Sequence, residues 1–260
     1  MTGINFGLDG KVILVTAASR GIGAAVVRTC LDSGASVAGN ARQAETIRSV
    51  FGDRVHPLAA DLEEPAAVAS LIPAVIDRFG RLDGLVVNTA GPPLFDVLET
   101  TDAHWRQAYE RLLSPAIQLA TAGAKAMVDQ GDGGSIVFLT STWAKQPHAK
   151  GGLSAVMRAG VSAFAKQLAL ELAERKVRVN SVMPGATATD RMTAILQSKA
   201  AANGTTEEEE AAKAVETIPM RTWGEAADIA NAVTFLLSPA SRFTTGIAMA
   251  VDGGAIKSTF

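Results

Sequence analysis

The residues with the clearest potential for chemistry form a short turn near the beginning of the chain, Ala17-Ala18-Ser19-Arg20-Gly21-Ile22-Gly23. Gly21 and Gly23 have no side chain that would keep the backbone away from the oxygens of a phosphate group. If a helix begins in this turn, its free amide groups and the positive end of its dipole would attract a pyrophosphate. The turn therefore predicts a dinucleotide site, and a plain tight turn without a ligand is the alternative.

The segments on either side of this turn must position it. Val12–Thr16 is an apolar run typical of a strand buried on both faces, and an alanine-rich helix follows the turn. We predict further strands at residues 36–39, 55–59, 85–87, 135–139, 177–183 and 246–251. Helices are predicted at residues 102–127, 151–174 and 225–237, and another begins at Pro65 with a kink or break at Pro73. Alternating strands and helices predict an α/β protein.

Composition narrows the class of protein. The chain has 260 residues, of which 48% are hydrophobic, and this suits one large α/β domain with a sheet covered on both faces. A net charge of −2 offers no basic surface for nucleic acid or an anionic membrane, and no apolar run approaches the roughly 20 residues that span a bilayer. Residues 1–11 do not resemble a signal peptide, and Cys30 is the only cysteine. We therefore expect a cytoplasmic protein in which Cys30 packs in the core.

Five motifs, spread over almost the whole chain, resemble those of the short-chain dehydrogenase/reductase family and follow the family's order. They are Thr16–Gly23, Asp61-Leu62, Asn88-Thr89-Ala90-Gly91, Asn180-Ser181-Val182-Met183-Pro184-Gly185 and Val251-Asp252-Gly253-Gly254. The resemblance implies one Rossmann-type domain over residues 1–260, with a doubly wound parallel sheet of about seven strands and helices on both faces. One departure is Ala17, which replaces the family's first glycine; a methyl group is tolerable there if the local φ is negative.

The resemblance also implies the residues that hold a dinucleotide. These are Thr16, Ser19, Arg20, Gly21, Ile22, Gly23, Arg42, Asp61, Leu62, Asn88, Ala90, Gly91, Pro184, Gly185 and Thr189. NAD-specific folds usually carry an acidic residue near the end of the second strand, and residues 40–42 contain none. Because Arg20 and Arg42 could pair with a 2′-phosphate, NADP(H) is favoured over NAD(H); the alternative is two solvated arginines. We expect no metal ion.

The family's catalytic groups are mostly missing. In its members a tyrosine protonates the carbonyl oxygen, a lysine four residues later lowers the pKa of that tyrosine, a serine orients the carbonyl and an asparagine serves a proton relay. Ser141 matches the serine, whereas the alignment places Leu153 at the tyrosine, Met157 at the lysine and Leu112 at the asparagine. Because a positioned general acid contributes about 10²–10⁴ in rate, an ordinary ketone should be a poor substrate.

Other side chains could take over part of this chemistry. The candidates are Tyr109, Lys145, His148, Lys150, Ser154 and Arg158. Tyr109 lies one helical turn before Leu112, His148 can titrate near neutral pH, and Arg158 could bind an anionic group of the substrate. Ser154 could donate a hydrogen bond, although a serine is a poor acid. For all six, core packing or a solvated surface is the alternative.

Two features concern larger parts of the molecule. Residues 187–217 are polar and alanine-rich and contain the run Glu207–Glu210, which we interpret as a solvated helix face within a substrate lid. Family members similar to this chain pair through the long helices that begin here near residues 102 and 151. We therefore expect a homodimer or a homotetramer.

Three functions remain open. The first is an NADP(H)-dependent oxidoreductase, either a ketone or quinone reductase or an alcohol dehydrogenase, with a small-molecule substrate and a non-standard proton path. The second is a non-redox enzyme that reuses the nucleotide pocket, and the third is a catalytically silent dinucleotide-binding sensor or partner protein. Ser141, Pro184-Gly185 and Thr189 belong to the nicotinamide end of the expected site, which favours the first function.

Overall fold

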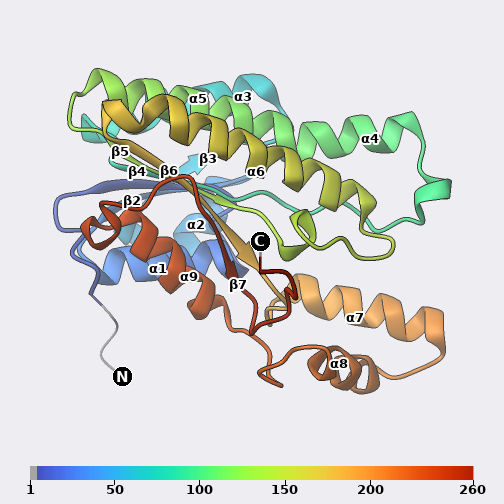
Figure 1. The fold of residues 1–260 in the computed structure, drawn as a ribbon. Helices are drawn as coiled ribbons and strands as arrows, with labels where there is room; N and C mark the ends of the chain where they lie inside the picture. Colours follow the sequence, from blue (N-terminus) through green and yellow to red (C-terminus); the bar gives the residue numbers. More distant parts are fainter. Residues whose placement is uncertain (1–4, 260) are drawn as a thin grey trace.

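The computed structural model describes residues 5–259, which form one parallel seven-stranded sheet between two layers of helices (Figure 1). The strands are β1 (Val12–Val15), β2 (Ser36–Ala41), β3 (Val55–Ala59), β4 (Gly84–Val87), β5 (Gly134–Leu139), β6 (Val177–Pro184) and β7 (Ala248–Val251). Their order across the sheet is β3-β2-β1-β4-β5-β6-β7, and all neighbours run parallel. The predicted doubly wound sheet is confirmed, because the chain builds outward from β1 to β3 and then, on the other side, from β4 to β7.

Helices cover both faces of this sheet (Figure 1). One face carries α3 (Pro65–Phe79), α5 (Ser114–Asp129) and α6 (Gly152–Leu172), and the other carries α1 (Gly21–Asp32), α2 (Ala44–Phe51) and α9 (Ala226–Leu237). Alternate residues of β1 point to opposite faces, so Leu14 joins the first core and Ile13 the second. Cys30 packs in the second core, where burial raises the pKa of its thiol to about 12, and its predicted packing role is confirmed.

Two helices differ from the sequence pattern. The pattern does not reveal α2, which is short and buries only Ile47 and Phe51. The expected interruption of α3 is also absent, because the helix runs from Pro65 to Phe79 with Pro73 inside it. Pro73 has no N–H to donate to the carbonyl of Ala69, one helical turn earlier. Both residues lie on the exposed face of the helix. Water can therefore satisfy that carbonyl, and the helix continues.

The long helix predicted at residues 102–127 is interrupted. It consists of α4 (Asp102–Ala108), a π-helical turn (Tyr109–Leu113) and α5. Ser114 donates its amide to the carbonyl of Tyr109, five residues earlier, and Pro115 has no N–H to bond Arg111. The missing donor explains why the regular ladder gives way at this point. The helix is capped by Thr101, whose hydroxyl accepts the amide of His104.

Residues 187–217 contain α7 (Asp190–Asn203) and α8 (Glu207–Glu216), which project from the body of the molecule (Figure 1). The acidic run is only partly a solvated face. Glu210 is buried and accepts hydrogen bonds from Lys213, Thr205 and Asn203 at 2.8–3.2 Å. These contacts join the two helices into one unit. No helix between residues 5 and 259 has the length and apolar character needed to cross a membrane.

Candidate active site

The glycine-rich turn opens directly into α1 at the carboxyl end of β1. Arg20 is the N-cap residue of α1 but makes no side-chain capping bond, and the first turn contains no acidic residue. The amides at this helix start are therefore available to an external anion. β1 lies between β2 and β4, where the strand order reverses, and α/β sheets bind ligands in the crevice beside such a point. These features fit the pyrophosphate of a dinucleotide.

The backbone of this turn differs from the expectation in one respect. Ala17 has a φ of +46°, in the left-handed region, whereas its methyl group is unstrained only at a negative φ. The negative φ that we expected at Ala17 is therefore not found. The side-chain Nδ2 of Asn88 donates to the Ala17 carbonyl at 3.2 Å, and a Cβ on Gly23 would overlap that same oxygen. The surrounding contacts thus hold Ala17 in a conformation that favours glycine.

Two predicted cofactor residues, Thr16 and Asn88, bond to each other. The Thr16 hydroxyl donates to the Asn88 carbonyl at 2.8 Å and accepts the Asn88 amide at 2.9 Å. Thr16 is fully buried. The pair fastens the turn after β1 to the loop after β4, so both residues position the crevice.

The end of β2 carries the residues expected to select the cofactor. Arg42 and Arg20 are exposed, and neither side chain has a hydrogen-bond or ion-pair partner among residues 5–259. Asn40 is buried, its side-chain amide donating to three carbonyls, including that of Ala60 at 3.0 Å. Asp61 follows β3 and accepts the amide of Glu63. The two arginines are therefore the side chains in this region with free charge for a phosphate.

The remaining predicted cofactor residues follow the carboxyl ends of the strands. They are Ser19, Ile22, Leu62, Ala90, Gly91, Pro184, Gly185 and Thr189. Thr189 lies against Gly21, with its Cγ2 3.6 Å from where a Cβ on Gly21 would be. The structure thus brings the segment after β6 next to the turn after β1.

Ser141 lies just beyond the carboxyl end of β5. Its backbone is extended, and its hydroxyl oxygen accepts the amide of Trp143 at 3.2 Å. With the oxygen engaged in this way, the hydroxyl proton is free to be donated to a ligand. Because β1 and β5 are parallel, Ser141 and the glycine-rich turn lie along the same edge of the sheet.

Arg158 and Leu112 line one small hollow, together with Thr89 and Leu139. Arg158 comes from α6, and its Nη1 donates to the carbonyls of Leu139 and Thr140 at 2.9 Å each. Burial and, secondly, the charge of Arg191 lower the pKa of the Arg158 guanidinium to about 10. At neutral pH the guanidinium is still protonated.

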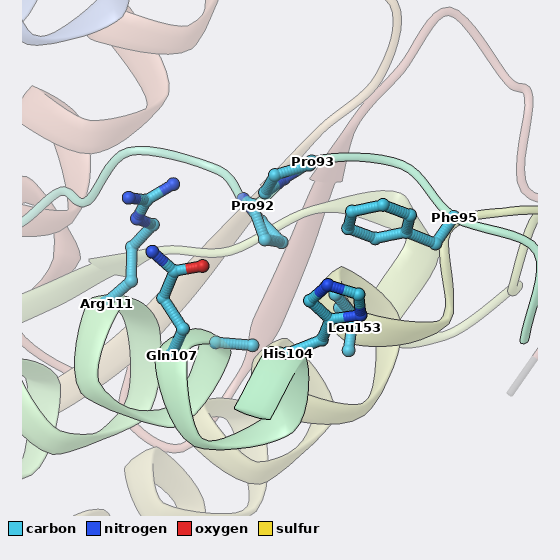
Figure 2. Close-up of a pocket in the computed structure, with 8 residues that line it drawn as sticks. Pro92, Pro93, Phe95, His104, Gln107, Arg111 and Leu153 are labelled. Carbon is cyan, nitrogen blue, oxygen red and sulfur yellow. The ribbon is translucent and has the colours of Figure 1, made fainter. Parts of the chain in front are cut away.

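Leu153 belongs to a different shallow hollow, between the loop after β4 and α4 (Figure 2). This hollow is lined by Pro92, Pro93, Phe95, His104, Gln107, Ala108, Arg111 and Leu153. Phe95 stacks on His104 with ring centroids 4.3 Å apart. Leu112 and Arg158 line one of these hollows, Leu153 lines the other, and Met157 lines neither.

The other candidate groups lie nearer the surface. Tyr109 is exposed on the π-helical turn, and Lys145, His148 and Lys150 are exposed on the loop after Ser141. The ring of His148 stacks on Trp143 at 5.3 Å. Ser154, in contrast, is only 5% exposed, and its hydroxyl has no hydrogen-bond partner among the described residues.

Arg191 was not indicated by any sequence motif. From the first turn of α7 its Nη1 and Nη2 donate to the carbonyls of Gly91 and Pro92 at 3.1 and 3.0 Å. A side chain on Gly91 would overlap this guanidinium. The residues in contact are about a hundred positions apart in the chain, so local sequence carries no signal for this approach.

The same arrangement of chain occurs in known proteins. A family model described as enoyl-(acyl carrier protein) reductase matches residues 16–255. The 3-oxoacyl-[acyl-carrier-protein] reductase FabG of Vibrio cholerae serotype O1 is 32% identical over 251 residues, which are 95% of this chain and 98% of the relative.

Two solved structures show the same likeness. YwfH, an NADPH-dependent reductase involved in bacilysin biosynthesis, has a TM-score of 0.91 and 25% identity, covering 95% of this chain and 99% of its own. The L-sorbose reductase of Gluconobacter frateurii, solved with NADPH and L-sorbose, has a TM-score of 0.90 and 29% identity, covering 98% of this chain and 100% of its own.

Proposed function

The chain belongs to the short-chain dehydrogenase/reductase family and is an oxidoreductase of that type, and we propose that it uses NADP(H) in preference to NAD(H) to reduce an activated carbonyl or a quinone, or to oxidise the corresponding alcohol. One observation carries the proposal. An uncapped helix start beside two exposed arginines shares the carboxyl edge of the sheet with the Ser141 hydroxyl. Of the three functions considered from the sequence, the comparisons favour this one.

The cofactor would lie along that edge. The start of α1 would hold its pyrophosphate, Arg20 and Arg42 its 2′-phosphate, and the segment with Thr189 its nicotinamide half. When bound, the nicotinamide supplies or accepts the hydride. The relatives support this assignment, since YwfH is an NADPH-dependent reductase and the L-sorbose reductase is complexed with NADPH.

The protein's own groups would act on the carbonyl oxygen. Reduction adds a hydride to the carbonyl carbon and a proton to its oxygen, giving an alcohol and the oxidised cofactor. Ser141 donates a hydrogen bond to the oxygen, and the positive charge of Arg158 stabilises the negative charge that grows there. Because this guanidinium keeps its proton at neutral pH, water supplies the proton. Such a path suits a carbonyl that needs little help from an acid.

We propose further that Ser154 and Arg158, rather than Leu153 and Met157, occupy the places of the family's tyrosine and lysine. Leu153 and Met157 share one face of the helix, and Ser154 and Arg158 share another. The two faces differ by about 100°, because each position along a helix turns the side chain by that angle. Arg158 reaches the end of β5 and lines the same hollow as Leu112, as a relay would require, whereas Leu153 lines the other hollow. The unpartnered hydroxyl of Ser154 lies one helical turn before Arg158.

Substrate range tests the function. With NADPH, the protein should reduce diacetyl and menadione and should turn over cyclohexanone poorly, because no tyrosine is available to protonate a simple ketone. The loss of nicotinamide absorbance measures these rates. If none of a broad set of carbonyls and quinones oxidises bound NADPH, the sensor interpretation replaces this one.

Two matched double variants test the alignment. Ser154→Tyr with Arg158→Lys should raise the kcat for cyclohexanone at least about tenfold, because it restores an acid and its lysine on the correct face. Leu153→Tyr with Met157→Lys should not raise it. The opposite result would favour the alignment with Leu153 and Met157. Circular dichroism and NADPH affinity would show that both variants fold.

A further inference from the structure

Two arginines near the proposed active site have no acidic partner. Among residues 5–259, Arg158 and Arg191 hydrogen-bond only to backbone carbonyls. Their neighbour Arg111 is different, because its Nε and Nη2 bind the carboxylate of Glu63 at 2.9 and 3.3 Å. Arg158 and Arg191 therefore bring positive charge to the cleft that no protein carboxylate neutralises.

Arg158 also has unused donors. Arg178, for comparison, engages both Nη1 and Nη2 with acceptors that include the carbonyls of Leu237 and Ser238 at the end of α9, and Arg191 also uses both of its Nη atoms. Arg158 engages Nη1 alone. No fully buried side-chain nitrogen in the described chain lacks a partner, so the free Nη2 and Nε of Arg158 reach solvent space. They can bind a ligand without breaking an existing contact.

Arg191 approaches the cleft from the projecting unit of α7 and α8. Its bonds to Gly91 and Pro92 fasten the start of α7 to the loop after β4. Among the described residues, no other side chain of α7 or α8 has a hydrogen bond to the body of the molecule. The guanidinium is thus held beside the loop that borders the site, on a segment that can close over a ligand.

The two guanidinium groups are anchored beside neighbouring strands, Arg158 at the end of β5 and Arg191 at the loop after β4. The charge of Arg191 is the second cause, after burial, of the lowered pKa of Arg158. Burial and then the charge of Arg111 lower the pKa of Arg191 in the same direction. Cations that share a cleft repel each other, and an anion bound between them would remove that cost.

We infer that Arg158 and Arg191 bind the carboxylate of an oxo-acid substrate whose carbonyl group meets Ser141. The free Nη2 and Nε of Arg158 form a fork that suits a planar carboxylate, and the charge of Arg191 adds to the attraction. A carbonyl activated by a neighbouring acid group matches a site without a tyrosine. The cofactor's phosphates are served elsewhere, by the start of α1 and by Arg42, on the far side of β4 from Arg158. This inference rests on the proposed reductase function and names its substrate class.

The first experiment compares acids with their esters. Pyruvate, phenylpyruvate and acetoacetate are each assayed with NADPH against the corresponding ethyl ester, and the acids should have kcat/KM values higher by about 10²-fold. Arg191→Met and Arg158→Lys should reduce this preference to about tenfold or less. Lys199→Met is the matched control, because Lys199 is on α7 and has no polar partner among the described residues, and it should leave the preference unchanged.

The second experiment measures binding without turnover. Calorimetry with phenylpyruvate and protein saturated with NADP⁺ should show binding to the wild type and to Lys199→Met. The affinity should be at least tenfold weaker in Arg191→Met, whereas NADPH affinity should be the same in all three proteins.

The outcomes separate the two proposals. If esters react as well as acids, the inference is wrong and the reductase function stands. If no carbonyl consumes NADPH but phenylpyruvate still binds in an arginine-dependent way, the reductase function is wrong and the carboxylate site stands. If Arg191→Met weakens NADPH binding and leaves the acid preference intact, Arg191 serves the cofactor and the inference is overturned.

Discussion

At the scale of single residues, Ala17 combines a side chain with a backbone conformation that favours glycine. Its φ of +46° is imposed by the bond from Asn88 to its carbonyl and by the packing of Gly23 against the same oxygen. A left-handed conformation costs a residue with a Cβ about 1–2 kcal/mol, and part of this is offset because glycine adds entropy to the unfolded chain.

Replacing Ala17 by glycine should therefore stabilise the protein. We expect Ala17→Gly to raise Tm by about 1–3 °C in a thermal melt. The control is Ala66→Gly in the exposed first turn of α3, where the same substitution should lower Tm because glycine weakens a helix. A fall in Tm for Ala17→Gly comparable to that of the control would show that Ala17 is not strained.

The exposed arginines give a second prediction at this scale. NADPH should bind more tightly than NADH by about 10–10² fold, because Arg20 and Arg42 can form charge-assisted bonds to a 2′-phosphate and residues 40–42 contain no acid to hold the ribose. Arg42→Ala should remove most of the difference. Arg48→Ala, which removes an arginine paired with Glu45 on nearby α2, should not. Fluorescence titration of both cofactors decides this, and equal affinities in the wild type would contradict the assignment.

At the scale of elements, the two helices of the projecting unit are joined through Glu210. Hydrogen bonds from Lys213, Thr205 and Asn203 lower the pKa of this carboxyl to about 2. A carboxyl whose pKa is lower in the folded state stabilises that state above its unfolded pKa, about 4.3. This contribution falls as the pH decreases through that value and is lost at about pH 2.

Hydrogen exchange should report this change. Protection factors of α8 amides, corrected for intrinsic exchange, should fall between about pH 4.5 and pH 2 in the wild type. In Glu210→Gln they should already be lower at neutral pH and should vary less with pH. Glu208→Gln, at an exposed position in the same first turn, should behave like the wild type. Equal protection in the wild type and Glu210→Gln would contradict the role of this carboxyl.

The elements also show what sequence can predict. The strands β1, β4 and β5 follow from apolar runs, because a parallel strand buried on both faces needs one, and the glycine-rich turn follows from its spacing between strand and helix. The π-helical turn at Tyr109–Leu113 and the positive φ of Ala17 depend on contacts made only in the folded chain. The meeting of Arg191 with Gly91 likewise depends on how two distant segments fold together.

The candidate site is predictable to a similar extent. Ser141 and the turn at the start of α1 are found from motifs. The proposed role of Arg158 does not follow from a motif, because a shift of one position along α6 changes which hollow a side chain lines. The proposed alignment therefore rests on a contact of the folded chain, the hydrogen bond from Arg158 to the end of β5, and not on motif spacing.

At the scale of the whole molecule, the outer surface of α6 predicts association. Leu170 and Val156 on this helix are 67% and 55% exposed and lie about four helical turns apart, on one face of it. We expect light scattering to give two or four times the chain mass of 26.9 kDa. Leu170→Lys should reduce the mass towards that of a monomer, and Val50→Lys, on α2 across the sheet, should not. A monomer mass for the wild type at micromolar concentration would contradict the prediction.

The central claim is that Ser141 holds the reacting carbonyl of an NADP(H)-dependent oxidoreductase. The most direct test is the single-turnover rate of NADPH oxidation by a preformed complex with an activated carbonyl, compared between the wild type and Ser141→Ala. We predict a rate lower by about 10²–10³ in the variant, with unchanged NADPH affinity, while Thr142→Val at the next position retains the wild-type rate. An unchanged rate in Ser141→Ala would contradict the account.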